Sequence, residues 1–335
     1  MKRSLVFFLA MICLLSSLLA GCSTGLEAPE TTVEEAKTTV EEIPSTTTEE
    51  KKEAPDPAED DVLNVLIIGN SFSTYYPDEL IRVANAAGVK MRVYSVYYSG
   101  CKMAQHWEWN RFKEGHYTLY IYNDPNKERS GLGNQNLTLD DCLEQENWDY
   151  ISLQQHFGPR VNMSYDDCYD SVKPYAKSLY TYISDMFPKA NLLWHQTWAY
   201  EVGYARDDGP MTSTEQQSIT HENIRAASQQ IAKDCDVTLL PAGDAWAIAR
   251  KNPVIGDTLC QSSAKNNGAG DHYHDGQEGG GQYLNACVWF EVLTGKSCIG
   301  NTFKPGYALD SAKIPELQKA AHEAVAAIYG ADFAK

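Results

Sequence analysis

Three residues of this chain have the types and the spacing that nucleophilic catalysis requires. Ser71 follows the apolar run of residues 62–68, from which a Gly-Asn pair that tolerates a sharp turn separates it. Far along the chain, Asp271 and His274 lie three residues apart in a glycine-rich segment. At this spacing the carboxylate can fold back onto the imidazole and fix its tautomer, while the other ring nitrogen faces a nucleophile. Asp271 and His274 are therefore a candidate orienting acid and general base.

Other interpretations of the same residues are open at this point. The serine could lie in an ordinary strand-to-helix turn and bond only the nearby backbone. The glycine-rich segment could be a polar loop without chemistry, or its nitrogen and oxygen donors could bind a metal ion. The donors are Asp271, His272, His274 and Asp275.

The surrounding pattern predicts one α/β domain over residues 61–335. We predict strands at residues 62–68, 91–98, 149–153, 191–194 and 237–240, and a hairpin or edge strand at 117–122. We predict helices at residues 78–87, 139–146, 164–187, 214–234, 244–251, 282–293 and 313–329. Strands that alternate with helices favour a flavodoxin-like fold, with a parallel five-stranded sheet and helices on both faces.

Several polar groups follow strands of this predicted sheet. Ser71 follows the first strand, Gly100 follows the second, and Gln154 and Gln155 follow the third. The carboxyl ends of parallel strands meet at one edge of a sheet, where open α/β folds bind their ligands. We therefore expect these residues to lie near one another.

The order of these motifs carries a resemblance. IGNSFS, SGCKMAQHW, WDYISLQQ, HQTWAY and the D-x-x-H that precedes GQYLNACVWFEVLTG together resemble the SGNH (GDSL-like) hydrolase superfamily. More narrowly they resemble a bacterial branch of it known mainly as a domain of unknown function. The resemblance covers residues 62–329.

The resemblance implies a serine hydrolase that needs no cofactor. Ser71 would be the nucleophile, His274 the general base and Asp271 the residue that orients it. The backbone amides of Ser71 and Gly100 would stabilise the oxyanion. The superfamily adds an Asn that this sequence lacks, so we expect Gln154 or Gln155 to donate in its place.

Aromatic and histidine side chains near the predicted edge favour a carbohydrate substrate. Rings with polar tips suit sugars, so we expect an acyl ester on a glycan. The predicted substrate-binding residues are His106, Trp107, His195, Trp198 and Tyr200. Two other functions are alternatives: a glycan-binding lipoprotein with slow chemistry, and a hydrolase that uses a metal ion at the Asp-His-x-His-Asp cluster.

The N-terminal residues predict export and anchoring. Residues 1–21 have a basic start and a short apolar core, typical of a signal peptide, and end in Leu-Ala-Gly before Cys22. This ending resembles a bacterial lipobox, which implies that Cys22 is lipidated and holds the protein at the membrane as a cell-surface or periplasmic lipoprotein. Residues 22–60 are rich in Thr, Glu and Pro and are expected to be a disordered tether.

Charge argues against a nucleic-acid partner. The formal net charge is −17, and the tether supplies about half of it. Nucleic-acid binding needs a basic surface, which this composition does not offer. The domain also holds seven cysteines, so at least one is unpaired if disulfides form after export.

The anchor can be tested directly. Replacing Cys22 by alanine should move the protein from the membrane fraction to the soluble fraction, because only the lipidated cysteine is expected to hold the domain there. Immunoblots of fractionated cells measure this. A variant that still sediments with membranes would contradict the lipobox interpretation.

Overall fold

The computed structural model describes residues 61–335, except 124–129, 158–162, 206–208 and 264–267. The predicted signal peptide, the lipidated Cys22 and the tether lie outside the described residues. Among the helices that are described, none is long and apolar enough to cross a bilayer.

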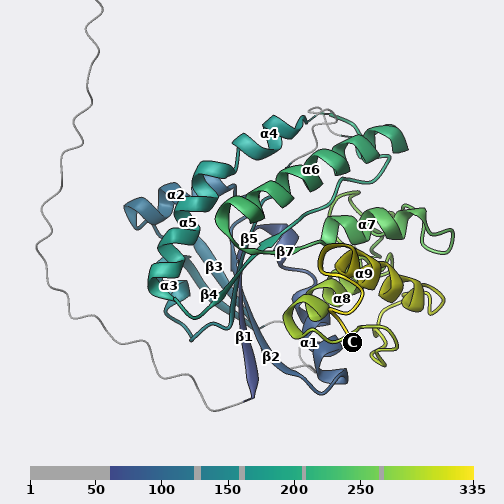
Figure 1. Ribbon diagram of the computed structural model, residues 1–335, viewed down its shortest axis with the longest axis horizontal. Coiled ribbons are helices and arrows are strands. Elements are labelled where there is room, and N and C mark those ends of the chain that lie inside the picture. The colour runs from purple at the N-terminus through teal and green to yellow at the C-terminus, as the bar shows by residue number, and fades with distance from the viewer. Residues whose placement is uncertain (1–60, 124–129, 158–162, 206–208, 264–267) are drawn as a thin grey trace, which may run out of the picture. The chain divides into compact units, whose positions relative to one another are not determined.

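A seven-stranded sheet forms the middle layer of the domain (Figure 1). Its order is β4-β3-β2-β1-β5-β6-β7. The strands are β1 (Val62–Gly69), β2 (Lys90–Tyr97), β3 (Tyr117–Tyr122), β4 (Ser130–Leu137), β5 (Tyr150–Gln154), β6 (Asn191–His195) and β7 (Thr238–Leu240). Strands β2, β1, β5, β6 and β7 are parallel, and β3 runs antiparallel to both β2 and β4.

The central strand β1 contributes to two separate cores. Val65 and Ile67 belong to the apolar cluster on one face of the sheet, whereas Leu66 and Ile68 belong to the cluster on the other face. All four side chains are fully buried. Successive side chains of a strand point to opposite faces, so a continuous apolar run is what a strand buried on both sides requires. The strand predicted at residues 62–68 is therefore confirmed as β1.

Helices cover both faces of the sheet, as predicted (Figure 1). One layer holds α1 (Pro77–Ala86), α7 (Ala242–Lys251), α8 (Gly281–Thr294) and α9 (Lys313–Tyr329). The other layer holds α2 (Met103–Phe112), α3 (Leu139–Leu143), α4 (Tyr165–Asp170), α5 (Lys173–Met186) and α6 (Thr214–Cys235). The prediction of an α/β fold between two helical layers is therefore confirmed.

The sheet has seven strands rather than the five predicted. The predicted hairpin strand β3 joins the parallel sheet through β2, and β4 pairs with β3. The sequence of β4, SGLGNQNL, has neither the alternation nor the β-branched residues that mark a strand. It was missed because its pairing depends on β3 and not on its own composition.

Two helical predictions also need correction. The single helix expected at residues 164–187 is two helices, α4 and α5, that are separated at Ser171 and Val172. Pro174 lies in the first turn of α5, where its missing N–H is tolerated, but it cannot continue an earlier helix. The helix α2 at residues 103–112 was not among the predicted helices. The Gln105 side chain caps its start by accepting from the Lys102 amide.

The cysteines of the domain are all free thiols. Six of the seven are buried, and no disulfide occurs among the described residues. Burial raises the pKa of Cys142 and of Cys168 to about 12, so these thiols stay protonated and unreactive.

A tryptophan stack fixes α7 beneath the sheet edge and gives a stability test. Trp246 is fully buried, stacks on Trp198 with 4.1 Å between ring centroids, and donates to Asn285 over 2.8 Å. Trp246→Ala should lower the free energy of unfolding by about 3–5 kcal/mol, because it leaves a cavity and an unpaired amide oxygen. Urea unfolding measures this. The control Phe112→Ala, at a side chain that is 62% exposed, should change stability by less than about 0.5 kcal/mol, and equal losses would contradict the assignment.

Candidate active site

The turn after β1 presents Ser71. The backbone leaves the strand at Asn70, which caps the short 3-10 helix Ser71–Ser73 by accepting from the Phe72 amide over 3.1 Å. Ser71 is partly exposed, whereas Asn70 and Phe72 are buried. The serine therefore lies at the carboxyl edge of the sheet with its support beneath it.

Asn70 also connects this turn to two neighbouring strand ends. Its Oδ1 accepts from Gln154 Nε2, at the end of β5, over 2.8 Å. Its Nδ2 donates to the carbonyl of Cys101, in the loop after β2, over 2.9 Å. One buried amide thus fixes the positions of three segments that surround Ser71.

Gly69 allows this close approach. A Cβ atom at position 69 would lie 2.3 Å from Gln154 Nε2 and 2.6 Å from Ser73 Oγ. No side chain larger than hydrogen fits there without displacing the turn. The glycine before Ser71 is therefore required by packing as well as by the turn.

Asp271 and His274 form the predicted pair. His274 Nδ1 and Asp271 Oδ2 are 2.6 Å apart, and Asp271 Oδ1 accepts from the His274 amide over 2.9 Å. The two carboxylate oxygens thus hold both the ring and the backbone of the histidine. With Nδ1 bonded to a carboxylate, the ring presents Nε2 as its basic nitrogen.

Glycines let the segment around this pair pack closely against the backbone of residues 260–261. A Cβ at Gly270 would be 2.0 Å from the Cys260 carbonyl oxygen, and one at Gly276 would be 2.0 Å from that of Gln261. Gly270 also has a φ of +79°, which L-residues rarely adopt. These glycines flank Asp271 and His274, so the close packing at both positions fixes where the histidine lies.

The structure brings His274 to the turn of Ser71. The imidazole centroid lies 5.5 Å from the ring of Phe72 and 5.2 Å from the ring of Tyr75. Both rings belong to the four residues that follow the serine. The acid–base pair from the C-terminal part of the chain therefore covers the turn from its N-terminal part.

The predicted glutamine donors already have acceptors within the protein. Gln154 is fully buried and its Nε2 donates to Asn70. Gln155 is 3% exposed, donates from Nε2 to Ser171 Oγ over 3.2 Å and accepts from the Met103 amide. Their geometry assigns both side chains to positioning and does not support the prediction that one of them binds an oxyanion.

His156 is the residue at this edge that sequence analysis missed. Its ring is stacked on Phe72, with 5.5 Å between centroids and 9° between planes, and its Nδ1 lies 3.5 Å from Tyr200 Oη. Burial lowers the pKa of His156 to about 4, which a hydrogen bond to the Gly100 backbone only partly opposes. The sequence signal was its place next to Gln154 and Gln155 after the third predicted strand, but we gave a role in the site to the two glutamines alone.

Gly100 lies in the loop that His156 contacts. It adopts a left-handed φ of +64°, in a turn closed by the Cys101 amide donating to the Tyr98 carbonyl. No atom lies within 4 Å of a Cβ built at Gly100, so space is open beside this residue. Its position at the edge shared with Ser71 is the one predicted.

Most of the predicted substrate-binding residues are buried. His106, His195 and Trp198 are at most 1% exposed, and Tyr200 is 6% exposed. His106 bonds Tyr117, His195 bonds Tyr76, and burial lowers the pKa of both histidines to about 3. Trp107 is half-buried and packs on the second core cluster. Burial of most of these side chains does not support the prediction that they form a sugar-binding surface.

The four candidate metal ligands do not converge. Asp271 and His274 bond each other, His272 Nδ1 lies 3.5 Å from Glu201 Oε2, and Asp275 accepts from Asn285 over 3.1 Å. Within the described ranges, no three His, Cys, Asp or Glu side chains are arranged to share a metal ion. The donors that the sequence placed together point to separate partners.

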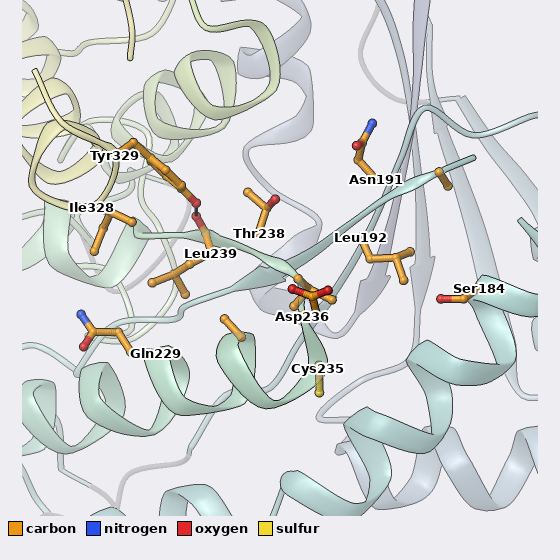
Figure 2. Close-up of a pocket in the computed structure, with 13 residues that line it drawn as sticks. Ser184, Asn191, Leu192, Gln229, Cys235, Asp236, Thr238, Leu239, Ile328 and Tyr329 are labelled. Carbon is orange, nitrogen blue, oxygen red and sulfur yellow. Dashed lines mark hydrogen bonds between the residues drawn. The ribbon is translucent and has the colours of Figure 1, made fainter. Parts of the chain in front are cut away.

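A hollow of about 830 Å³ lies away from this site (Figure 2). It is formed by the amino ends of β6 and β7 with the ends of α6 and α9, as Asn191, Thr238, Cys235 and Tyr329 show in Figure 2. Ser71 follows the carboxyl end of β1, so the hollow and the serine lie at opposite ends of the parallel strands. Because of this position, the hollow has no part in the proposed chemistry, although it is large.

Comparison with known proteins assigns the family. Residues 64–324 match the model of DUF4886, a domain of unknown function. The chain belongs to this family. A DUF4886 family protein from Bacteroides uniformis, whose crystal structure is known at 1.50 Å, is 28% identical and has a TM-score of 0.68, with 82% of this chain and 98% of that chain covered. The predicted branch of unknown function is thereby confirmed.

More distant solved structures carry hydrolase names. The lipase/acylhydrolase from Enterococcus faecalis is 12% identical with a TM-score of 0.43, over 70% of this chain and 96% of that one. An acetyl xylan esterase is 11% identical with a TM-score of 0.41, over 68% of this chain and 99% of that one. Among curated proteins, none matches the sequence.

The neutral state of His156 has a measurable effect on stability. Because its pKa is about 4 in the folded protein against an ordinary 6.5, the unfolded chain binds a proton between these values that the folded chain does not. As the pH falls through this window, the free energy of unfolding of wild type should decrease by about 1.4 kcal/mol per pH unit relative to that of His156→Gln. Above the window, the difference between the two proteins should not change with pH. Urea unfolding at about pH 8 and about pH 5 tests this. Parallel pH profiles for the two proteins would show that His156 is protonated normally.

Proposed function

We propose that this protein is a serine esterase that removes small acyl groups, acetyl first among them, from carbohydrate outside the cytoplasm. The observation that carries the proposal is the Asp271–His274 pair, bonded over 2.6 Å and packed on the turn that presents Ser71. A nucleophile, a base and an acid that orients the base are the parts that acyl transfer by a serine needs.

The proposed reaction uses these groups in two steps. His274 removes the Ser71 hydroxyl proton as Oγ attacks the ester carbonyl carbon, and Asp271 stabilises the imidazolium that forms. The tetrahedral intermediate expels the sugar oxygen, which takes that proton, and an acyl-enzyme remains. Water, activated by the same imidazole, then attacks the acyl-enzyme, and carboxylic acid and free serine result.

The oxyanion donors we propose are the backbone amides of Ser71 and Gly100. Both lie at the carboxyl edge, and Asn70 fixes their two loops to each other through Phe72 and Cys101. Each donor of this kind contributes about 3 kcal/mol to the transition state. In place of a glutamine donor, His156 acts as a positioning residue, because its contact with the Gly100 backbone fixes that loop from the other side.

The triad predicts a specific pattern of losses. Ser71→Ala and His274→Ala should each remove nearly all hydrolysis of p-nitrophenyl acetate, and the double variant should be hardly slower than either single one, because triad members act as a unit. Asp271→Asn should lose less, since an imidazole without its acid remains basic. Steady-state kinetics measure all four.

The matched control is Ser73→Ala, which removes a second hydroxyl from the same turn without touching the proposed nucleophile. It should retain most of the activity. Independent, multiplying losses at Ser71 and His274 would contradict the triad. An activity that is abolished by EDTA and unaffected by Ser71→Ala would instead support the metal-dependent alternative. Sugar binding without ester hydrolysis would support the glycan-binding one.

A further inference from the structure

A polar pocket of about 300 Å³ lies beside the proposed active site. It is formed by the first turns of α1, the residues before them, and the segment that leads into α8. Its lining residues are Thr74, Tyr75, Asp78, Glu79, Arg82, Gln277 and Gln282. This volume is at the lower end of the range of about 300–1,000 Å³ that is usual for small-molecule sites.

The pocket shares a wall with the site. The Tyr75 ring lines it and also packs edge-on against His274, with 5.2 Å between centroids. Thr74, on the same wall, donates from Oγ1 to the Ser71 carbonyl over 3.3 Å. A molecule in the pocket is therefore one side chain away from the proposed base.

Glu79 is the unusual residue of this pocket. It is 1% exposed, its Oε1 is 3.3 Å from Arg82 Nη1, and its Oε2 has no hydrogen-bond partner among the described residues. Burial raises the pKa of Glu79 to about 7, which Arg82 only partly opposes. Near neutral pH such a carboxyl exists in both forms, so it can accept a hydrogen bond or donate one. Because Glu79 lines the pocket, a ligand group there can supply the hydrogen bond that this oxygen lacks.

The lining excludes several classes of ligand. The lining holds two carboxyl groups, Asp78 and Glu79, and one guanidinium, Arg82, and this balance of charge disfavours phosphate and other anions. An acyl chain would take water away from the charged and amide groups without hydrogen-bonding to them, at the cost of their desolvation. The ligand class that fits is one with hydroxyl groups, because each hydroxyl both donates and accepts a hydrogen bond. Adjacent hydroxyls can bond the carboxylate, guanidinium and amide groups of the lining in pairs.

We propose that this pocket binds a sugar ring of the acylated substrate, with Glu79 and Arg82 holding adjacent ring hydroxyls. The inference rests on the proposed esterase function. It moves the carbohydrate contacts from the aromatic residues of the strand ends, which are buried, to α1 and the segment before α8. Tyr75 then lies between the sugar and the acyl group and orients the ester toward Ser71.

The test compares two substrates of the same enzyme. The ratio of kcat/KM for acetylated xylobiose to that for p-nitrophenyl acetate should fall about tenfold in Glu79→Gln, because the amide keeps the volume but cannot serve as a charged acceptor. Arg82→Gln, at a side chain that is 24% exposed, should lower the ratio similarly and guards against misfolding of the buried variant. Asn85→Ala, exposed on the same helix, is the control and should leave the ratio unchanged.

The outcomes separate this inference from the proposed function. An unchanged ratio in both pocket variants overturns the sugar pocket and leaves the esterase intact. If wild type hydrolyses neither substrate, the esterase proposal fails, and calorimetric titration with xylobiose decides on the pocket. Binding that Glu79→Gln abolishes would support it, and the absence of binding would overturn it.

Discussion

The buried side chain of Asn70 is the contact on which the geometry of this site depends. It bonds the Phe72 amide, the Gln154 amide group and the Cys101 carbonyl. These partners come from the turn after β1, the end of β5 and the loop after β2, so one amide sets the spacing of three strand ends. A buried amide satisfies its donors and its acceptor only in one orientation, and this gives the network its specificity. The hydrogen that Gly69 has in place of a side chain is what lets Gln154 reach it.

Two buried histidines, one on each side of the sheet, stay neutral. His106 and His195 are fully buried, and their rings pack on Tyr117 and Tyr76. Their low pKa values keep them uncharged across the neutral range. His274, by contrast, is bonded to the Asp271 carboxylate over 2.6 Å, which stabilises its charged form. The site thus concentrates its positive charge, when it forms, on one ring.

Local patterns predicted the parts of this protein that depend on neighbours in sequence. The apolar run of β1 and the limits of α9 follow from periodicity, and the Asp271–His274 bond follows from a three-residue spacing. The strand β4 was not predictable, because its polar sequence becomes a strand only by pairing with β3.

Side-chain roles were harder to predict than backbone elements. The glutamines at the end of β5 and the aromatics after β6 have the right chemistry for a binding surface, yet Gln154 and Trp198 are buried by residues distant in sequence. Burial is a property of the assembled layers, so residue type alone could not separate a supporting side chain from one that contacts substrate. The pocket on α1 was missed for the same reason, since its walls come from segments about 200 residues apart.

The helix α8 follows directly on the segment that carries His274, and every residue from Gly281 to Leu293 is buried. Such a helix has no face for water, so it holds its place only when α1, α7 and α9 surround it. The proposed base therefore depends on the packing of α7, α8 and α9, whereas the serine is positioned by β1, about 200 residues earlier in the sequence. During synthesis, the nucleophile emerges long before the helices that complete its partner. The proposed site can therefore be complete only after α9, which packs on α8, has been synthesised.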